Sequence, residues 1–147
     1  MTTNIELENY AKKHKFKNFR GVIFTDQLSK MKPYEIECGI LGSRSSKSNE
    51  DMHWTCWFKF KDKIYVFDSY GLAPDNRLTK YLKNGKKRTV LNSTFQIQKF
   101  GENTCGQWCL FILESLNNIL KSKQQITNED FEKIILDKIY KLDILAV

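Results

Sequence analysis

One cysteine stands where an irregular polar segment gives way to an apolar helix. Cys105 and Gly106 follow Asn103-Thr104. Behind them, apolar residues recur at three- and four-residue intervals and predict one buried helical face: Trp108, Phe111, Ile112, Leu116, Ile119 and Leu120. The unpaired N–H groups and the positive dipole at a helix N-terminus would lower the pKa of the thiol and make it a better nucleophile. The alternative is a small, unreactive packing residue, which is the commoner role for a cysteine taken alone.

Two alternating segments predict a β-hairpin that brings an imidazole and a carboxylate together. Residues 53–60 alternate in side-chain type, and residues 64–68 form a second strand-like run. With a two-residue loop at 61–62, His53 and Asp68 become diagonal neighbours, about 7 to 8 Å apart at Cα. A register slip of one residue would put them on opposite faces of the hairpin. The predicted contact therefore depends on the loop.

These side chains match the needs of a thiol protease, which are a nucleophile, a base, a group that orients the base, and donors for an oxyanion. We take His53 as the base because the other histidine, His14, lies among lysines on a predicted surface. Gln98 would bring an amide near the thiol and, with the backbone N–H of Cys105, would form the oxyanion hole. Gly106 would keep the approach to the thiol uncrowded. Taken separately, a strand-opening histidine and a strand glutamine are more often structural than catalytic.

The elements that position these residues are predicted from the same patterns. We expect helices near residues 3–15 and 76–82 and from residue 127 onward, a strand within 33–42, a second strand over 89–100, and a polar loop at 42–50. A chain of 147 residues with 41% hydrophobic content suits one compact domain, residues 1–147. Apolar runs are too short for a membrane span, and residues 1–4 lack a signal-peptide pattern. We therefore expect a soluble, intracellular, unsecreted protein.

The net charge of +7 comes largely from two basic clusters, Lys12 to Lys17 and Lys80 to Arg88. Such clusters attract polyanions such as DNA, and a merely solubilising surface is the alternative. The candidate nucleic-acid contacts are Lys83, Lys86, Lys87 and Arg88. The chain has only four cysteines, and free thiols in a reducing compartment are expected: Cys38, Cys56, Cys105 and Cys109. Without a paired Cys-x-x-Cys motif, we expect no metal site.

Four short segments keep a fixed order along the chain: His53-Trp54, Phe67-Asp68-Ser69-Tyr70-Gly71, Gln98, and Thr104-Cys105-Gly106-Gln107-Trp108-Cys109. Gly21-Val22 and Cys38-Gly39-Ile40-Leu41 precede them. This arrangement, over roughly residues 7–116, resembles the adenain family of viral cysteine proteases. It resembles more distantly the ubiquitin-like-protein-specific proteases of the same clan.

The resemblance implies an α+β fold in which a central mixed β-sheet packs against the helix that carries the catalytic cysteine. It implies that Cys105 is the nucleophile, His53 the general base and acid, Asp68 the orienting carboxylate and Gln98 the oxyanion donor. Trp54 matches the tryptophan that borders a narrow substrate channel in this family. A preference for glycine beside the cut bond would follow, because a side-chain-free backbone passes such a constriction.

The expected function is a viral endopeptidase that matures structural precursors at glycine-containing sites, in the host nucleus or the virion. Asp68 stands where adenovirus enzymes use glutamate and where the ubiquitin-like-protein proteases use aspartate, so a modifier deconjugase is the alternative. A non-catalytic nucleic-acid-binding domain is the third hypothesis. No cysteine lies between Ser69 and Thr104, so no disulfide-linked peptide cofactor is expected. We expect a monomer that needs no small-molecule cofactor, with stimulation by DNA left open.

Overall fold

The computed structural model describes residues 3–43, 45–46, 52–94, 96–97 and 104–145. Within them, five strands form one mixed sheet in the order β1-β2-β3-β4-β5. Their bounds are β1 Phe19–Phe24, β2 Ile36–Gly42, β3 Trp54–Phe60, β4 Lys63–Phe67 and β5 Val90–Asn92. The two outer pairs, β1/β2 and β4/β5, are parallel, whereas β2, β3 and β4 pair antiparallel.

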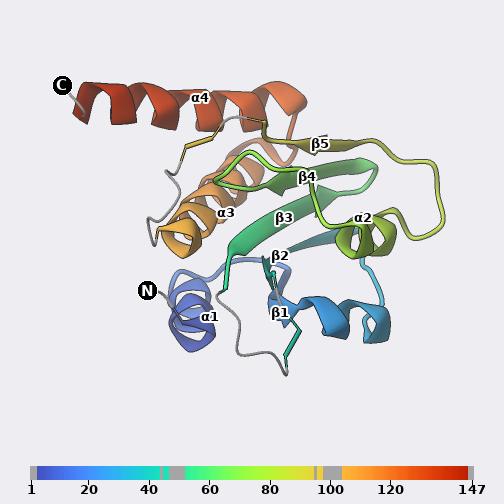
Figure 1. Ribbon diagram of the computed structural model, residues 1–147. Helices are drawn as coiled ribbons and strands as arrows, with labels where there is room; N and C mark the ends of the chain where they lie inside the picture. Colours follow the sequence, from blue (N-terminus) through green and yellow to red (C-terminus); the bar gives the residue numbers. More distant parts are fainter. Residues whose placement is uncertain (1–2, 44, 47–51, 95, 98–103, 146–147) are drawn as a thin grey trace.

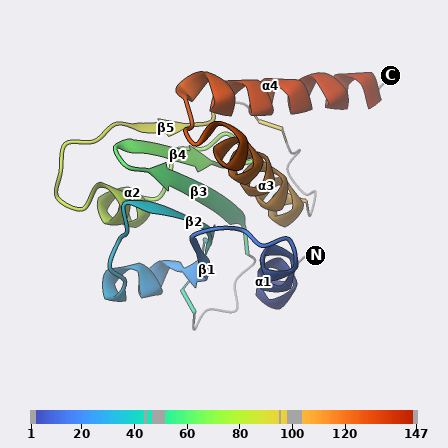
Figure 2. The same cartoon turned by 180° about the vertical axis from the view of Figure 1, so that it is seen from behind.

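Helices cover both faces of this sheet (Figures 1 and 2). Their bounds are α1 Asn4–Lys13, the 3-10 helix η1 Thr25–Lys30, α2 Asn76–Lys83, α3 Cys105–Lys123 and α4 Asn128–Leu145. One buried cluster joins α1, α3 and α4 to one sheet face, and a second joins η1 and α2 to the other. No helix in the described part is long and apolar enough to cross a membrane.

The central hairpin has the predicted register. Phe60 pairs with Lys63 and Cys56 pairs with Phe67. The loop therefore consists of Lys61 and Asp62. Lys61 takes a left-handed conformation with φ 57°. With this register, β3 begins and β4 ends at the open end of the hairpin. His53, just before β3, and Asp68, just after β4, therefore lie at the same end of the sheet.

The alternation along β3 divides its side chains between two buried clusters. Cys56 and Phe58 pack toward α3, whereas Trp57 packs toward α2. The second face is as well covered as the first, so even Lys59 is buried there. Burial and the nearby Arg88 both lower the pKa of Lys59.

The termini of three helices carry local capping interactions. Thr3 and Glu6 form a capping box at the start of α1. Asn84, in a left-handed conformation, ends α2. Thr127 and Asp130 exchange side-chain and backbone hydrogen bonds at the start of α4. Each of these caps depends on residues within about one helical turn.

The predicted strand at 89–100 is wrong in its extent, because β5 covers only Val90–Asn92. Its partner β4 ends at Phe67, which leaves no ladder for a longer strand. Ser93 instead bonds to the backbone of Asp68 through its hydroxyl. Residues 95 and 98–100 lie outside the described part of the chain.

Substitution of Gly39 by alanine should destabilise the sheet. Gly39 pairs with Trp57, and a Cβ at this position would overlap two atoms of the indole ring. The ring has little freedom to move, because its Nε1 donates a hydrogen bond of 2.9 Å to buried Glu37. We expect the free energy of unfolding, measured by urea titration, to fall by about 1 to 3 kcal/mol.

The variant Gly39→Ala/Trp57→Phe provides the control for this prediction. A smaller ring relieves the contact, so the double variant should lose less stability than the sum of the two single variants. Strictly additive losses would show that the indole is not the obstacle.

Candidate active site

The candidate catalytic side chains come from three elements that meet at one end of the sheet. His53 immediately precedes β3, Asp68 immediately follows β4, and Cys105 is the first residue of α3. The hairpin register sets the first two side by side, and the packing of α3 against β3 brings the third to the same place. The α3 helix starts at the edge of the molecule shown on the left of Figure 1.

A short hydrogen bond joins the histidine and the carboxylate. His53 Nε2 lies 2.7 Å from Asp68 Oδ1. The same oxygen accepts the backbone N–H of Tyr70 at 2.8 Å, as in an Asx turn. Asp68 is only 5% exposed, so water competes little for these bonds. The carboxylate therefore fixes which imidazole nitrogen remains for the thiol, namely Nδ1.

The ring of Tyr70 holds the imidazole from a second direction. Its centroid lies 4.3 Å from that of His53, with an angle of 12° between the planes. Stacking restricts rotation of the imidazole about its χ2 bond, and an aromatic face also favours a cation above it. His53 is thus oriented by a hydrogen bond at its edge and by a ring on its face.

Further hydrogen bonds fix the backbone of the Asp68 segment. The Ser93 hydroxyl accepts from the Asp68 N–H at 3.1 Å and donates to the Asp68 carbonyl at 3.2 Å. The Ile97 N–H donates to the carbonyl of Ser69 at 2.8 Å. The chain after β5 therefore supports the carboxylate, although it no longer belongs to the sheet.

The thiol of Cys105 is buried among donors. It is 8% exposed, and its Sγ accepts the backbone N–H of Trp54 at 3.4 Å. Burial by itself would raise the pKa of this thiol. The interactions with His53 and with the N–H groups of Trp54 and Gly106 outweigh burial, and the pKa is lowered. The thiolate is the form that these donors stabilise.

The imidazole shows the matching shift. Burial would lower the pKa of His53, but the hydrogen bond to Asp68 and the interaction with Cys105 raise it to about 9. The Nδ1 atom of His53 is buried, and no hydrogen bond of ordinary length and angle reaches it from the described atoms. Both shifts favour an imidazolium beside a thiolate. Such a pair can attack an electrophilic carbon and later supply a proton to the leaving group.

Of the three other predicted site residues, the structure describes Trp54 and Gly106 but not Gln98. Trp54 is buried, its ring centroid lies 6.3 Å from that of Phe24, and its contact with the thiol is made by its backbone N–H. Gly106 is buried in the first turn of α3. Gln98 lies outside the described residues, so the structure does not place the predicted oxyanion donor.

The remaining cysteines have a packing environment. Cys109, one turn after Cys105, is fully buried against Cys56. Burial raises its pKa, the opposite of the shift at Cys105. All four cysteines are free thiols. Among the described residues, no group of three or more His, Cys, Asp or Glu is arranged to hold a metal ion.

The predicted nucleic-acid cluster needs one correction. Lys86 and Lys87 are exposed and Lys83 is half-buried, but the side chain of Arg88 is only 3% exposed. It points inward, 3.5 Å from the carboxylates of Glu35 and Asp62, because the chain returns to the sheet there to begin β5. Arg88 is therefore unavailable to a phosphate backbone.

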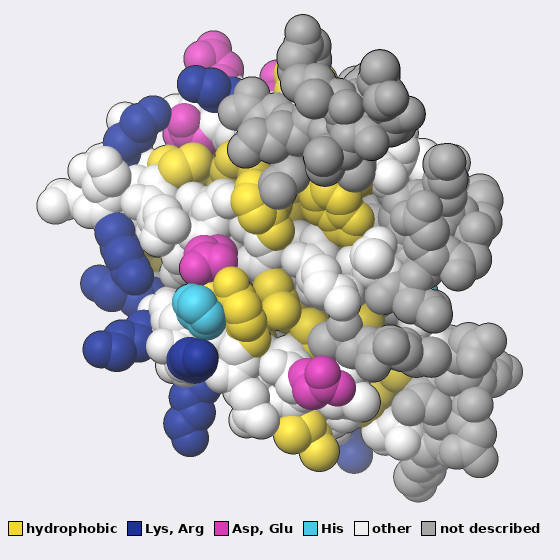
Figure 3. All heavy atoms as spheres, turned by 90° about the vertical axis from the view of Figure 1, so that its left-hand side faces the viewer, with side chains coloured by type: hydrophobic (Ala, Val, Ile, Leu, Met, Phe, Trp, Pro, Cys, Tyr) yellow, Lys and Arg dark blue, Asp and Glu magenta, His cyan; other side chains and the backbone are white. Residues whose placement is uncertain are grey.

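The first basic cluster remains on the surface. Lys12, Lys13, Lys15 and Lys17 are all exposed. On the face shown in Figure 3, Lys and Arg side chains gather along one margin, and hydrophobic side chains occupy the middle. The positive charge is thus spread over separate parts of the surface.

Two supports of the site were not predicted as functional residues. The sequence contains a signal for Tyr70, since an aspartate two residues earlier can accept its N–H in an Asx turn. No local signal identifies Ser93, which lies 25 positions from Asp68 and reaches it only through the parallel pairing of β4 and β5.

Comparison with known proteins identifies the fold. No protein-family model and no curated protein matches the sequence. The solved structure of ASFV pS273R protease matches with a TM-score of 0.57 and 14% identity over 88% of this chain. Its selenomethionine form matches with a TM-score of 0.59 and 15% identity over 89% of the chain. The chain spans 63% and 65% of the length of those two structures.

This likeness confirms the α+β class expected from the sequence, with a central mixed sheet packed against the helix that carries Cys105. At this level of identity the likeness shows the fold and does not single out the adenain family.

Proposed function

We propose that this chain is a cysteine endopeptidase that uses Cys105 as nucleophile, His53 as general base and acid, and Asp68 as the orienting carboxylate. The observation that carries the proposal is the 2.7 Å bond from Asp68 to His53 Nε2, which leaves Nδ1 for a thiol whose pKa is lowered. The fold shared with a protease supports the same conclusion.

The reaction follows from these positions. The Cys105 thiolate attacks the carbonyl carbon of the scissile peptide, and the carbonyl oxygen becomes an oxyanion. The backbone N–H of Cys105 and the amide of Gln98 are the proposed donors to it. His53 protonates the leaving amine as the C–N bond breaks, which leaves a thioester on Cys105. His53 then takes a proton from water, whose attack on the thioester releases the acid and restores the thiol.

The proposed substrates are viral precursor proteins with glycine beside the cut bond. The backbone N–H of Trp54 contacts the thiol, and Gly106 follows Cys105 in the first turn of α3, so these two residues are the proposed borders of the substrate site. We place the cleavage in the host nucleus or the virion, by a single-domain monomer that needs no small-molecule or disulfide-linked cofactor. DNA stimulation would act through Lys83, Lys86 and Lys87.

A deconjugase of ubiquitin-like modifiers is the second candidate, because the third member of the site is an aspartate. Incubation with a Gly-X-Gly-containing peptide and with a ubiquitin-like vinyl sulfone separates the two functions. The endopeptidase should cut the peptide and leave the vinyl sulfone unreacted, and a deconjugase should show the reverse. If neither reacts with the wild-type protein, the protease proposal fails.

The remaining hypothesis, a nucleic-acid-binding domain without catalysis, makes a different prediction. It requires salt-sensitive DNA affinity that persists unchanged in the Cys105→Ala variant, together with no hydrolysis by the wild type. DNA affinity alongside hydrolysis would instead fit stimulation of the protease by DNA.

Tyr70 should act as a positioning residue for the base. Loss of its ring in Tyr70→Ala frees the imidazole to rotate, and we expect kcat to fall roughly 10-fold, the equivalent of one stacking interaction. Tyr70→Phe keeps the ring and should retain most of the activity. Equal losses in both variants would indicate that the hydroxyl, rather than the stacked ring, supports catalysis.

The pH dependence of kcat/KM should report the ionisation of His53 beside Cys105. Because the pKa of His53 is raised to about 9, kcat/KM should decline only as pH passes about 9. Asp68→Asn removes the charge and alters the hydrogen bond that raise this pKa, so the alkaline limb should move to lower pH. An alkaline limb that stays in place in a folded Asp68→Asn protein would contradict the assigned partner.

A further inference from the structure

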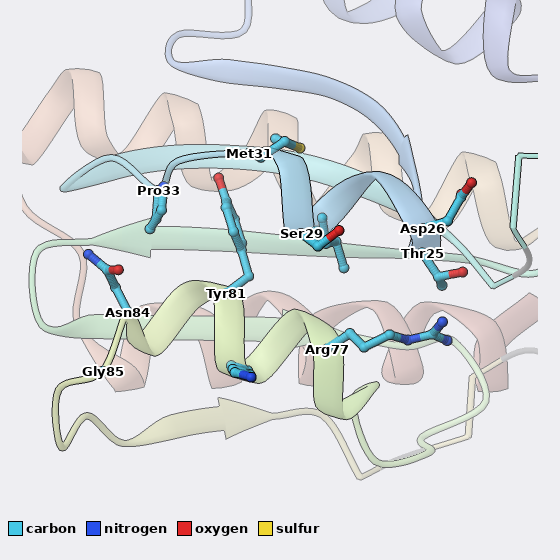
Figure 4. Close-up of a pocket in the computed structure, with 11 residues that line it drawn as sticks. Thr25, Asp26, Ser29, Met31, Pro33, Arg77, Tyr81, Asn84 and Gly85 are labelled. Atoms are coloured by element: carbon cyan, nitrogen blue, oxygen red, sulfur yellow. The ribbon is translucent and has the colours of Figure 1, made fainter.

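A pocket of about 670 Å³ lies between η1 and α2, on the sheet face opposite α3 (Figure 4). None of His53, Asp68 and Cys105 lines it. Pockets that hold small ligands or side chains span roughly 300 to 1,000 Å³. The lining consists of Thr25, Asp26, Leu28, Ser29, Met31, Pro33, Arg77, Lys80, Tyr81, Asn84 and Gly85. We call it the α2 pocket.

The walls of the α2 pocket are fixed by buried hydrogen bonds. Tyr81 extends from α2 toward Pro33 and Met31, and its hydroxyl donates to the buried carboxylate of Glu37 at 2.8 Å. The Arg20 guanidinium donates to the same hydroxyl at 3.1 Å. The tyrosine ring therefore stands in place before any ligand arrives, which reduces the entropy lost on binding.

The opposite end of the pocket is also anchored. Asp26 accepts the backbone N–H of Ser46 at 2.8 Å and its hydroxyl at 2.7 Å. These bonds lower the pKa of Asp26, so the carboxylate is charged and already partnered. Of the residues that line the described pocket, Asp26 is the one with an acidic side chain.

Cations line the side of the pocket formed by α2. Arg77 extends toward the Thr25 end, and two hydrogen bonds to Asp75, of 3.1 and 2.9 Å, hold its guanidinium. Its side chain is nevertheless 59% exposed, which leaves surface for a ligand. Lys80 is exposed on the next turn of α2, and Lys30 and Lys83 stand nearby in sequence at the ends of η1 and α2.

The floor of the pocket is apolar. Leu28, Met31, Pro33 and Tyr81 contribute it, and Leu28 and Tyr81 belong to the buried cluster on this sheet face. A cationic side above an apolar floor suits a ligand that is acidic and carries a bulky apolar group. A nucleic acid would use the cations, but its phosphate backbone would gain nothing from the floor.

We propose that the α2 pocket binds an acidic segment of a partner protein, with one bulky apolar side chain of that segment inserted against Tyr81 and Leu28. The carboxylates of the segment face Arg77 and Lys80. Since the site lies across the sheet from Cys105, binding does not depend on the proposed protease chemistry. It should be equal in the wild type and in Cys105→Ala.

Fluorescence polarisation with a labelled peptide tests the proposal. The probe is an octapeptide of Glu and Asp with a central Phe-Leu pair, and the matched control peptide has Ser-Ser at the centre. The full chain should bind the first peptide at least about 10-fold more tightly than the second. Higher salt should weaken the binding, because carboxylates pair with exposed cations.

Two variants and one control locate the site. Lys80→Glu reverses a charge on the cationic side, and Ser29→Trp fills the pocket from η1. Each should weaken binding at least about 10-fold. Lys121→Glu makes the same charge change on an exposed residue of α3 and should bind as the wild type does.

Three results would overturn the proposal. The first is equal affinity for the two peptides, which would show that the apolar floor is unused. The second is unchanged binding in both pocket variants. The third is tighter binding of a duplex oligonucleotide that displaces the peptide, which would make the cationic side a nucleic-acid surface.

Discussion

Cys105→Ala should remove peptide hydrolysis, with kcat reduced on the order of 10⁶-fold, as is typical when a nucleophile is deleted. The covalent intermediate cannot form without Sγ, and no other described thiol can replace it. Cys109 is fully buried, with a raised pKa, and Cys38 and Cys56 are also buried. Cleavage of a Gly-X-Gly-containing peptide, followed by chromatography, measures the loss.

Cys109→Ala is the matched control, since it removes a thiol one helical turn away. It should lower stability slightly through lost packing and leave kcat near the wild-type value. If Cys105→Ala retained measurable hydrolysis and Cys109→Ala did not, the assignment of the nucleophile would be wrong.

His53→Ala should have the second largest effect. Burial raises the pKa of Cys105, and the interaction with His53 is the largest of those that lower it, so the variant should have a higher thiol pKa and should also lack the proton donor for the leaving amine. We expect kcat to fall by roughly 10⁴-fold or more. Steady-state kinetics at pH 7 measures this effect.

His14→Ala provides the comparison for the base. His14 stacks on Tyr10 at 3.9 Å and pairs with Glu114 on the surface of α1 and α3, away from Cys105. Its removal should leave kcat unchanged. Comparable losses in the two histidine variants would mean that His53 is not the base.

The hairpin shows what sequence periodicity can predict. Alternation fixes which side chains share a face, and a two-residue loop fixes the register, so the neighbourhood of His53 and Asp68 followed from local rules. The helix that begins at Cys105 followed in the same way from its apolar period. Both features depend on residues close together in the chain.

Features that depend on distant partners were not predictable. The length of β5 is limited by the end of β4, which a propensity for strand at 89–100 cannot reveal. Arg88 looked like part of a basic surface, yet the return of the chain to the sheet buries it. Ser93 supports Asp68 only because β4 and β5 pair in parallel. Each outcome was decided by tertiary packing rather than by local sequence.

The pH dependence of Cys105 alkylation tests the central claim most directly. Iodoacetamide reacts with the thiolate, and peptide mass spectrometry reports each cysteine separately. We predict that Cys105 reacts faster than the other three cysteines, with a rate that rises below the usual thiol pKa of about 8.5. In His53→Ala this rise should move to higher pH. A Cys105 that reacts as slowly as Cys109, with no effect of His53→Ala, would contradict an activated nucleophile at this site.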